Sequence, residues 1–457
     1  MSPLSEKAAR NRELITSGPM VKAIFALAVP VVFGQMMEVL LAVTDFYWVG
    51  RLGPAAQDAV TSSMIMIWTV FATASIISIG VTALVSRYVG AGDPDKAAHY
   101  ARQGLWLVVV LGGLVSLLGV TFSPQLLSFM GAGQATRGHA VPYLRIFFAS
   151  ALLLYLVEIM YAIFRASGDT RTPVKVGITV VCVNMVLDPL LIFGWGPFPE
   201  LGVAGAALAT AIAFLTGVSL IARFLLAGRV GYRIGTPVSE APSLSSMGKI
   251  ARIGLPISSQ QLVFVMVYWF LIGFVHQFGE SAGAAMGIGN RMESFSYLTC
   301  YGFSIAASTL VGQNLGADKP DRAARCAWGA VGSGVGLTLI FSALFLGMPG
   351  LITSVFTDDP QVRRIAIDYL IILGLSQSAM AVEIILEGAF SGSGNTIPPM
   401  AVMLPGSAAR IPLAWYLAFH LDWGVNGIWW TLTITTGLKA VILAWWFSLG
   451  RWKQKKL

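Results

Sequence analysis

Charged side chains are scarce in this 457-residue sequence, because only 11% of its residues are Asp, Glu, Lys or Arg, where soluble proteins hold about 25%. Cysteine is scarcer still: the chain has 3, too few and odd in number for a disulfide-stapled secreted scaffold. What fills the chain is apolar, with 56% hydrophobic residues and a further 49 glycines. A soluble domain leaves about a quarter of its chain surface exposed and could not hide so much apolar surface. The composition excludes an ordinary soluble enzyme and indicates a polytopic membrane protein.

Apolar runs long enough to cross a membrane recur along the whole chain. A spanning helix needs about 20 largely apolar residues. Runs of this kind without Asp, Glu, Lys or Arg cover 59–86, 103–136, 201–222, 253–279, 294–317, 326–357 and 388–409. Further spans with embedded charges cover 23–49, 138–165, 173–194, 364–390 and 424–448. We predict an all-α polytopic membrane protein with twelve transmembrane helices.

The basic residues indicate how the chain is oriented. Of the 30 Lys and Arg residues, 22 fall in termini and loops on the side of the N-terminus, and such an excess marks the cytoplasmic side. Both termini are therefore expected in the cytoplasm, with the protein in the inner (plasma) membrane. The first 22 residues are polar and charged, which does not fit a signal peptide. The net charge of +8 is spread over many short loops, so no nucleic-acid partner is expected.

The two halves of the chain repeat each other at an offset of 226 residues. Pro30 matches Pro256, and Ser167-Gly168 matches Ser393-Gly394 in the same register. The longest polar connection, 228–249, separates the repeats, with six predicted spans on each side. An even number of spans gives both halves the same orientation, an arrangement that transporters use with the substrate path between the halves.

We predict two lobes of six helices each, related by a pseudo-twofold axis along the membrane normal. The N-lobe covers 1–235 and the C-lobe covers 236–457. A channel would more often show identical subunits or a re-entrant filter motif, and the sequence has no such motif.

Acids inside the first-half spans indicate where the chemistry lies. A charge inside a span costs about 2.5–3.5 kcal/mol on insertion scales, so it is usually paired or functional. The first half has Glu38, Asp45, Glu158 and Asp188 against one embedded base, Arg145. Because the acids outnumber the base, we expect cation chemistry in this half. Glu158 lies deeper toward the cytoplasm and is interpreted as structural.

A candidate cation site combines the first and fifth spans. Asp45 lies five residues before Gly50 and Asp188 six residues before Gly194, so both lie roughly 7–9 Å below the outer surface. Asn184 is one helical turn before Asp188 on the same face. Carboxylate and amide oxygens suit a hard cation such as Na⁺, and crowded carboxylates can carry protons instead. We assign Asp45, Asn184 and Asp188 as the candidate coupling site for H⁺ or Na⁺.

Supporting residues surround this candidate site. Gln35 and Glu38 share one face of the first span with Asp45, and Tyr143 reaches a similar depth from the fourth span. Pro189 has no N–H to donate to the carbonyl of Met185, so that oxygen is available to a cation or a water. Alternative interpretations stay open: Glu38 as a satisfied polar contact, and Tyr143 as an ordinary interfacial aromatic residue.

The second half has a more balanced set of embedded charges. Glu383 and Glu387 accompany Arg410 and Lys439, and Glu293 stands at a predicted span edge. This balance indicates structural ion pairing or a polar path. The candidate C-lobe polar site consists of Gln261, Glu293, Arg410 and Glu387.

Several motifs together resemble the multidrug and toxic compound extrusion (MATE) family across essentially the whole chain. They are Thr44-Asp45 with Val49-Gly50-Arg51-Leu52-Gly53, the turn from Phe164 through Ser167-Gly168-Asp169-Thr170 to Pro173 with its echo from Phe390 to Pro399, and Asn184-x-x-x-Asp188-Pro189. The resemblance implies an inner-membrane antiporter that exports cationic and amphiphilic compounds in exchange for H⁺ or Na⁺. For the DinF-like branch it implies an N-lobe ion site at Asp45, Asn184 and Asp188, with Tyr143 beside it and a first span that bends at Pro30.

The sequence departs from the NorM-like branch of that family in the C-lobe. The seventh span has no acid, and Met380 stands at the position expected for an acid in the tenth span. Glu293 and Glu387 are the candidate replacements. The threonine that the family places on the sixth span falls near Ala206 and Thr210.

The expected function is cation-coupled antiport by alternating access, with small amphiphilic or cationic substrates, membrane lipids as surroundings and a monomeric state. No cofactor beyond the coupling ion is expected. The four histidines show no paired metal-ligand spacing, which argues against an intramembrane enzyme. The alternative is a flippase for a lipid-linked precursor, for which Arg145 and Arg410 would supply a cationic cavity.

Overall fold

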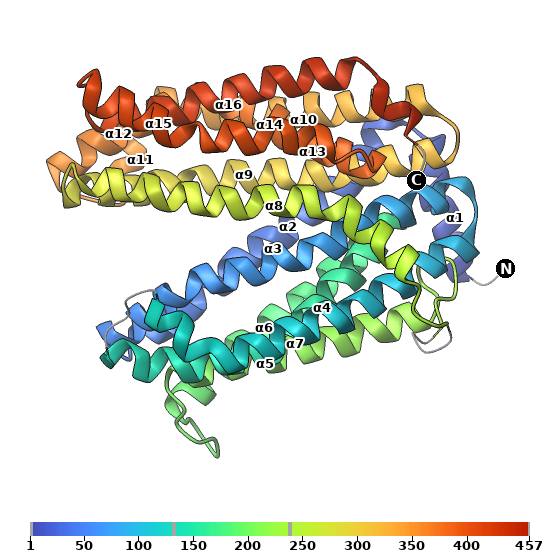
Figure 1. The fold of residues 1–457 in the computed structure, drawn as a ribbon, viewed down its shortest axis with the longest axis horizontal. Coiled ribbons are helices and arrows are strands. Elements are labelled where there is room, and N and C mark those ends of the chain that lie inside the picture. Colours follow the sequence, from blue (N-terminus) through green and yellow to red (C-terminus); the bar gives the residue numbers. More distant parts are fainter. Residues whose placement is uncertain (1–2, 130–133, 236–239, 456–457) are drawn as a thin grey trace. The chain divides into compact units, whose positions relative to one another are not determined.

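A computed structural model describes residues 3–129, 134–235 and 240–455 of the chain. Every regular element in these ranges is a helix (Figure 1), so the all-α prediction is confirmed. Among the described residues, 9 helices are long and apolar enough to cross a membrane, and a pair of helices that bends by 54° at a short break makes up to 10.

The first half of the chain follows the predicted spans closely. A short N-terminal helix, α1, precedes six long helices, and each of the first six predicted spans lies on one of them. Their bounds are α1 (Pro3–Thr16), α2 (Met20–Gly50), α3 (Pro54–Ala91), α4 (Pro94–Phe129), α5 (Gln134–Ala166), α6 (Arg171–Phe193) and α7 (Val203–Leu226).

The second half has more broken helices. Its elements are α8 (Leu244–His276), α9 (Glu280–Gly316), α10 (Pro320–Gly347), α11 (Pro349–Ser354), α12 (Pro360–Gly374), α13 (Gln377–Ser393), α14 (Ile397–Ala408), α15 (Arg410–Trp415), η2 (Tyr416–His420), α16 (Val425–Ser448) and η3 (Arg451–Gln454). The predicted span 364–390 is the bent pair α12 and α13. Helix α9 begins at Glu280, fourteen residues before the predicted start of the eighth span at 294, because an uncharged run leaves out the charged first turns of a helix.

The chain divides into two compact units, described here one at a time. Unit 1 contains Met1–Ile15 and Phe33–Gly254, and unit 2 contains Thr16–Val32 and Leu255–Leu457. The predicted lobe boundary after residue 235 adjoins 236–239, which lie outside the described residues. The division by contacts differs from the predicted lobes, because the first part of α2 belongs to unit 2 and the first part of α8 to unit 1.

Close helix packing explains this exchange of helix segments. In unit 1, Gly254 of α8 lies so close to α3 that an added Cβ would be 2.6 Å from the carbonyl carbon of Ile76. In unit 2, a Cβ on Gly302 of α9 would be 3.3 Å from the carbonyl oxygen of Ala28 in α2. Both pairs obey the 226-residue offset, since 254 − 28 = 226 and 302 − 76 = 226. The sequence repeat is therefore also a structural repeat, and each unit contains the first part of the other repeat's first long helix.

One helix of unit 1 and two helices of unit 2 are central to the packing of their unit. In unit 1, α5 contacts α3, α4, α6 and α7. Of the 18 residues in its most apolar stretch, 67% are buried. In unit 2, α9 and α13 contact each other and α10, and the fully buried rings of Tyr369 and Trp429 meet edge to face with centroids 4.6 Å apart. Helices α5, α9 and α13 carry several of the polar side chains described below.

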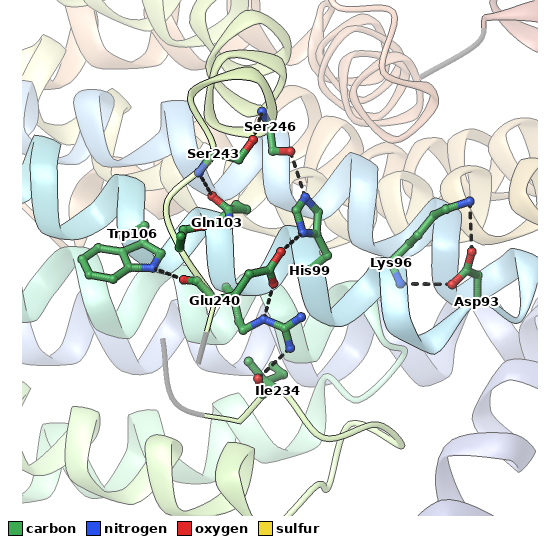
Figure 2. A network of polar contacts seen from close by, with 11 residues as sticks. Asp93, Lys96, His99, Gln103, Trp106, Ile234, Glu240, Ser243 and Ser246 are labelled. Carbon is green, nitrogen blue, oxygen red and sulfur yellow. Dashed lines mark hydrogen bonds and ion pairs between the residues drawn. The ribbon is translucent and has the colours of Figure 1, made fainter. Parts of the chain in front are cut away.

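The connection between α7 and α8 is attached to α4, as Figure 2 shows. The Glu240 carboxylate accepts a hydrogen bond from Arg102 Nε at 2.6 Å and contacts His99 Nδ1, while Trp106 Nε1 donates to the Glu240 carbonyl at 3.0 Å. His99 Nε2 shares a 2.8 Å hydrogen bond with Ser246 in the first turn of α8. Partial burial opposes ionisation of Glu240, but the hydrogen bonds from Arg102 and His99 outweigh it and lower its pKa. This network holds the start of α8 in unit 1.

Helix α1 is fixed to the turn between α5 and α6. Lys7 Nζ lies 3.0 Å from Asp169 Oδ2, and Asn11 donates to the Gly168 carbonyl at 3.2 Å. Asp169 also accepts the backbone N–H of Thr172 at 3.1 Å, at the start of α6. Burial would raise the pKa of Asp169, yet the hydrogen bonds from Thr172 and Lys7 outweigh burial and lower it. The acid of this motif therefore joins two helices of unit 1.

Candidate functional site

The predicted coupling residues from α2 and α6 lie together inside unit 1. Asn184 and Asp188 have 0% exposed surface. With the Asn184 amide oriented by its hydrogen-bond network, its nitrogen donates to Asp45 Oδ1 at 2.8 Å and to Asp188 Oδ2 at 3.3 Å. Asp45 and Asp188 therefore lie together, as their depths in the spans predicted, and Asn184 bridges them.

The two carboxyl groups lie close together, since one amide nitrogen, that of Asn184, reaches an oxygen of each. An ionised carboxylate has no proton and can only accept hydrogen bonds. Two ionised carboxylates this close together repel each other, and a proton or a cation would relieve that repulsion.

Two further side chains complete the surroundings of the pair. The Thr210 hydroxyl of α7 is 3.2 Å from the Asn184 amide oxygen, which resolves the choice between Ala206 and Thr210, because Ala206 lies in a neighbouring apolar cluster. Tyr143 of α5 packs against the same cluster, and the charges of Asp45 and Asp188 act on its hydroxyl. The sequence could place Tyr143 by depth, but it could not place Thr210.

Other predicted residues lie along α2 and α6. Gln35 Nε2 donates to Glu38 Oε2 at 3.1 Å. Pro30 lies inside α2, two residues before the point where the helix leaves unit 2 for unit 1. Pro189 lies inside α6, so the Met185 carbonyl lacks its usual helical donor. The functional roles of these residues stay predictions.

Unit 2 contains a buried ion pair that the sequence suggested. Lys439 Nζ of α16 lies 2.7 Å from Glu383 Oε1 of α13, with side chains 4% and 13% exposed. One turn along α13, Glu387 accepts a 2.5 Å hydrogen bond from Gln260. The sequence analysis named the neighbouring Gln261, whose role stays a prediction. Gln260 was missed, because a shift of one residue turns a helical side chain by about 100°.

Arg410 and Glu293 lie in the same unit but make separate contacts. The Arg410 guanidinium donates to Thr435 and Thr436, each at 3.0 Å, and lies 5.8 Å from the Phe264 ring centroid. Glu293 Oε2 is 3.3 Å from the Tyr369 hydroxyl. Glu293, predicted to stand at a span edge, is the fourteenth residue of the 37-residue helix α9.

Comparisons with known proteins agree with this repeated helical fold. The model of the MatE family matches residues 30–190 and again 256–416, two stretches whose starts differ by 226 residues. The chain belongs to the MatE family. As a MatE protein it is a multi-pass membrane transporter and not an enzyme. The resemblance found in the sequence is thereby confirmed.

Relatives match along nearly the full length of the chain. A probable multidrug resistance protein NorM of Thermotoga maritima is 26% identical over 440 residues, which cover 95% of this chain and 93% of the relative. An FAD transporter of Shewanella oneidensis is 27% identical over 440 residues, covering 94% and 95%. The chain thus belongs with the multidrug efflux transporters of the MATE and NorM kind, and these matches do not favour the alternative of a lipid-precursor flippase.

Solved structures agree with the fold. A transporter of the MOP superfamily from Pyrococcus furiosus superimposes with a TM-score of 0.90 at 23% identity, covering 98% of this chain and 99% of that chain. An outward-facing MATE transporter of the same superfamily gives a TM-score of 0.90 at 22% identity, again covering 98% and 99%. These matches confirm the predicted fold class of twelve helices in two lobes.

Proposed function

We propose that this MatE transporter is a cation-coupled antiporter, with Asp45, Asn184 and Asp188 as its coupling site. The observation that supports this most is that the Asn184 amide donates to both Asp45 and Asp188, which brings their carboxyl groups together. The coupling ion we propose is H⁺, because a proton on one of the two acids would relieve the repulsion between them. Na⁺ on the same three side chains is the competing possibility.

Loss of that proton would leave two negative charges side by side in a buried site. Like charges in contact repel strongly where water is excluded, so the deprotonated site would favour a different conformation or the approach of a cation. Antiport requires that the ion and the substrate differ in their affinity for two conformations. Proton binding at Asp45 and Asp188 supplies such a difference.

The proposed conformational element is α2. Its first part, up to Val32, packs in unit 2, and its second part carries Asp45 in unit 1. Pro30 lacks the N–H of a regular helix and weakens the helix near this change of unit. A change at Asp45 would thus alter the shape of α2 around Pro30, as alternating access requires.

The proposed substrates are small amphiphilic compounds, often cationic, as for the relatives named multidrug resistance proteins. We further propose a monomer in the plasma membrane, surrounded by lipid, with both termini in the cytoplasm and no cofactor other than the coupling ion. The candidate polar site of unit 2, with Gln261, Glu293, Arg410 and Glu387, would contact polar groups of the substrate or stabilise the unit.

Proteoliposomes with an imposed pH gradient and ethidium as the probe test the coupling site. Asp45→Asn and Asp188→Asn should abolish proton-driven ethidium transport, because an amide cannot release a proton. Asp95→Asn, a matched change at an exposed position, should transport like the unchanged protein. Full transport by both site variants would refute the assignment.

The same vesicles distinguish the ion and the substrate. An imposed Na⁺ gradient at equal pH on both sides should drive no ethidium transport if H⁺ is the coupling ion, and transport under this gradient alone would make Na⁺ the ion. FAD serves as a second probe, since one relative is named an FAD transporter. Competition of FAD with ethidium would show that the substrate range includes anionic dinucleotides.

A further inference from the structure

A buried cation in unit 2 has no acidic partner. Arg410, the first residue of α15, is only 6% exposed, and a guanidinium stays ionised in proteins. Its Nε donates to the Thr435 hydroxyl and its Nη2 to the Thr436 hydroxyl, each at 3.0 Å. The ion pairs of the described residues do not include Arg410. An uncompensated charge within spanning helices is expensive and usually functional.

The acids of the same unit have other partners. Glu383 pairs with Lys439 at 2.7 Å, and Glu387 accepts a hydrogen bond from the Gln260 amide. Glu293 lies 3.3 Å from a tyrosine hydroxyl. Two threonine hydroxyls thus solvate the guanidinium, but neither carries the negative charge that would balance it.

The free end of the guanidinium has the geometry that a carboxylate requires. A guanidinium has five N–H groups, one on Nε and two on each Nη. The two threonines occupy the edge formed by Nε and one hydrogen of Nη2. Nη1 makes no hydrogen bond to a described residue and is not among the fully buried atoms that lack a partner, so it belongs to the exposed part of Arg410. The end formed by Nη1 and Nη2 can therefore donate two parallel hydrogen bonds to one carboxylate.

An exposed aromatic ring lies beside this end of Arg410. The centroid of the Phe264 ring is 5.8 Å from the guanidinium carbon, and Phe264 is 43% exposed. Its other neighbour is Tyr268, whose ring is stacked on it with centroids 5.9 Å apart. Aromatic rings pair favourably in stacked or edge-to-face arrangements. A planar ring that carries a carboxylate would thus find both of its parts matched here.

Phe264 is exposed on the inner side of α8. At about 100° per residue, it points about 160° away from Met266 and about 140° away from Trp269, which are 62% and 64% exposed. It lies only about 40° from Gln260, which contacts Glu387 of α13 inside unit 2. The apolar face with Met266 and Trp269 suits lipid, whereas the face with Phe264 is open to a solute next to Arg410.

We propose that Arg410 and Phe264 form a binding site for planar aromatic compounds that carry a carboxylate. The carboxylate accepts two N–H groups from the Nη1–Nη2 end of Arg410, and the ring packs on Phe264. A singly charged carboxylate fits better than a doubly charged phosphate, because Glu293 and Glu383 are electrostatic neighbours of Arg410 and would repel a second charge. The inference rests on the proposed function, since it adds aromatic acids to the substrates of the proposed antiporter.

Equilibrium binding to the purified protein tests this site. The probes are anthracene carboxylate, a fluorescent planar acid, and anthracene carboxamide, which has the same rings and no charge. Fluorescence anisotropy in detergent solution gives both affinities, with protein-free detergent as the blank. The unchanged protein should bind the acid about tenfold more tightly than the amide, because hydrogen bonds between charged groups are stronger than those between neutral ones.

Variants of the two residues assign this preference to the site. Arg410→Gln should lower the affinity for the acid about tenfold and leave that for the amide unchanged. Phe264→Leu should weaken both probes about threefold, because both have the rings. Arg410→Lys keeps the charge without the two parallel donors and should lose part of the preference. Arg364→Gln changes an exposed arginine of the same unit and should alter neither affinity.

Several results would overturn the proposal. Equal affinities of the unchanged protein for acid and amide refute it without any variant. Melting temperatures show which variants fold, and Arg410→Lys replaces Arg410→Gln if the latter does not. A full acid preference in either variant would refute the site, and so would an equal loss of both probes in Arg410→Gln, which would make Arg410 structural. Unchanged affinities in Phe264→Leu would refute the aromatic contact.

The outcome is independent of the coupling site. Equilibrium binding needs no ion gradient, so the acid preference is measured whether or not protons drive transport. Full proton-driven transport by both Asp45→Asn and Asp188→Asn would remove the proposed coupling site and leave the Arg410 site standing. Equal binding of acid and amide would do the reverse.

Discussion

Removal of Lys439 from its buried ion pair is expected to destabilise the transporter strongly. Lys439→Met keeps the length of the side chain and removes its charge. The 2.7 Å contact with Glu383 Oε1 is then lost, and Glu383 Oε2 already lacks a hydrogen-bond partner. The carboxylate would be left buried with no donor on either oxygen.

The magnitude follows from the burial of the pair. Breaking a buried ion pair by removing one partner costs about 3–5 kcal/mol, because the remaining charge stays out of water. For a chain of this size we expect the melting temperature to fall by roughly 3–5 °C. The double variant Lys439→Met with Glu383→Gln removes both charges and should recover most of that loss, since neutral replacement of a buried pair is often tolerated.

The cysteines of the protein provide the assay. Cys300 and Cys326 are 0% exposed, so a thiol-reactive fluorophore reports their exposure as the protein unfolds in detergent. Cys182 is exposed and is replaced by Ser to remove the background. The two single variants, the double variant and the parent form a double-mutant cycle, which isolates the energy of the pair. A Lys439→Met variant as stable as the parent would refute the reasoning, as would a double variant no more stable than the single ones.

Three further predictions concern other parts of the fold. Gly392→Val should lower the melting temperature through a cost of about 1–3 kcal/mol, because a Cβ on Gly392 would lie 2.7 Å from the Ser308 carbonyl carbon; the same thiol assay measures this. The pKa of Asp169 is lowered on folding, so its contribution to stability is complete above about pH 4 and is lost as pH falls through its folded pKa; Asp169→Asn should therefore flatten the acid side of the melting-temperature profile. Glu240→Gln should speed trypsin cleavage in the α7–α8 connection, followed on a gel.

Each of these predictions has a contradicting outcome. For the packing change the matched control is Gly332→Ala, at a position with open space, and equal effects at both glycines would argue against close helix contact. An unchanged acid limb in Asp169→Asn would show that its contacts with Lys7 and Thr172 do not stabilise the folded state. Equal cleavage rates with and without Glu240 would mean that its network does not hold the connection.

The sequence was informative about the fold wherever apolar length decided the outcome. Uncharged runs and the 226-residue repeat located the spans, since both depend on composition and register. The exchange of the first parts of α2 and α8 was not predicted, because hydropathy shows that a segment is buried and not which helices bury it. The bend between α12 and α13 was missed for a similar reason: its break lies within an apolar run.

The candidate site was predictable to the extent that helix geometry determines it. Asp45 and Asp188 could be paired by counting residues from the helix ends, and Asn184 by its spacing from Asp188. Thr210 comes from a third helix whose rotation about its axis the sequence leaves open. Gln260 was missed for the same reason.

Proton release on substrate binding tests the central claim most directly. The purified protein is placed in weakly buffered detergent solution with a pH indicator, and ethidium is added while its binding is followed by fluorescence. The account predicts that the unchanged protein releases protons as ethidium binds, and that Asp45→Asn and Asp188→Asn release none. Equal proton release from Asp188→Asn, or ethidium binding to the unchanged protein with no proton release, would contradict it.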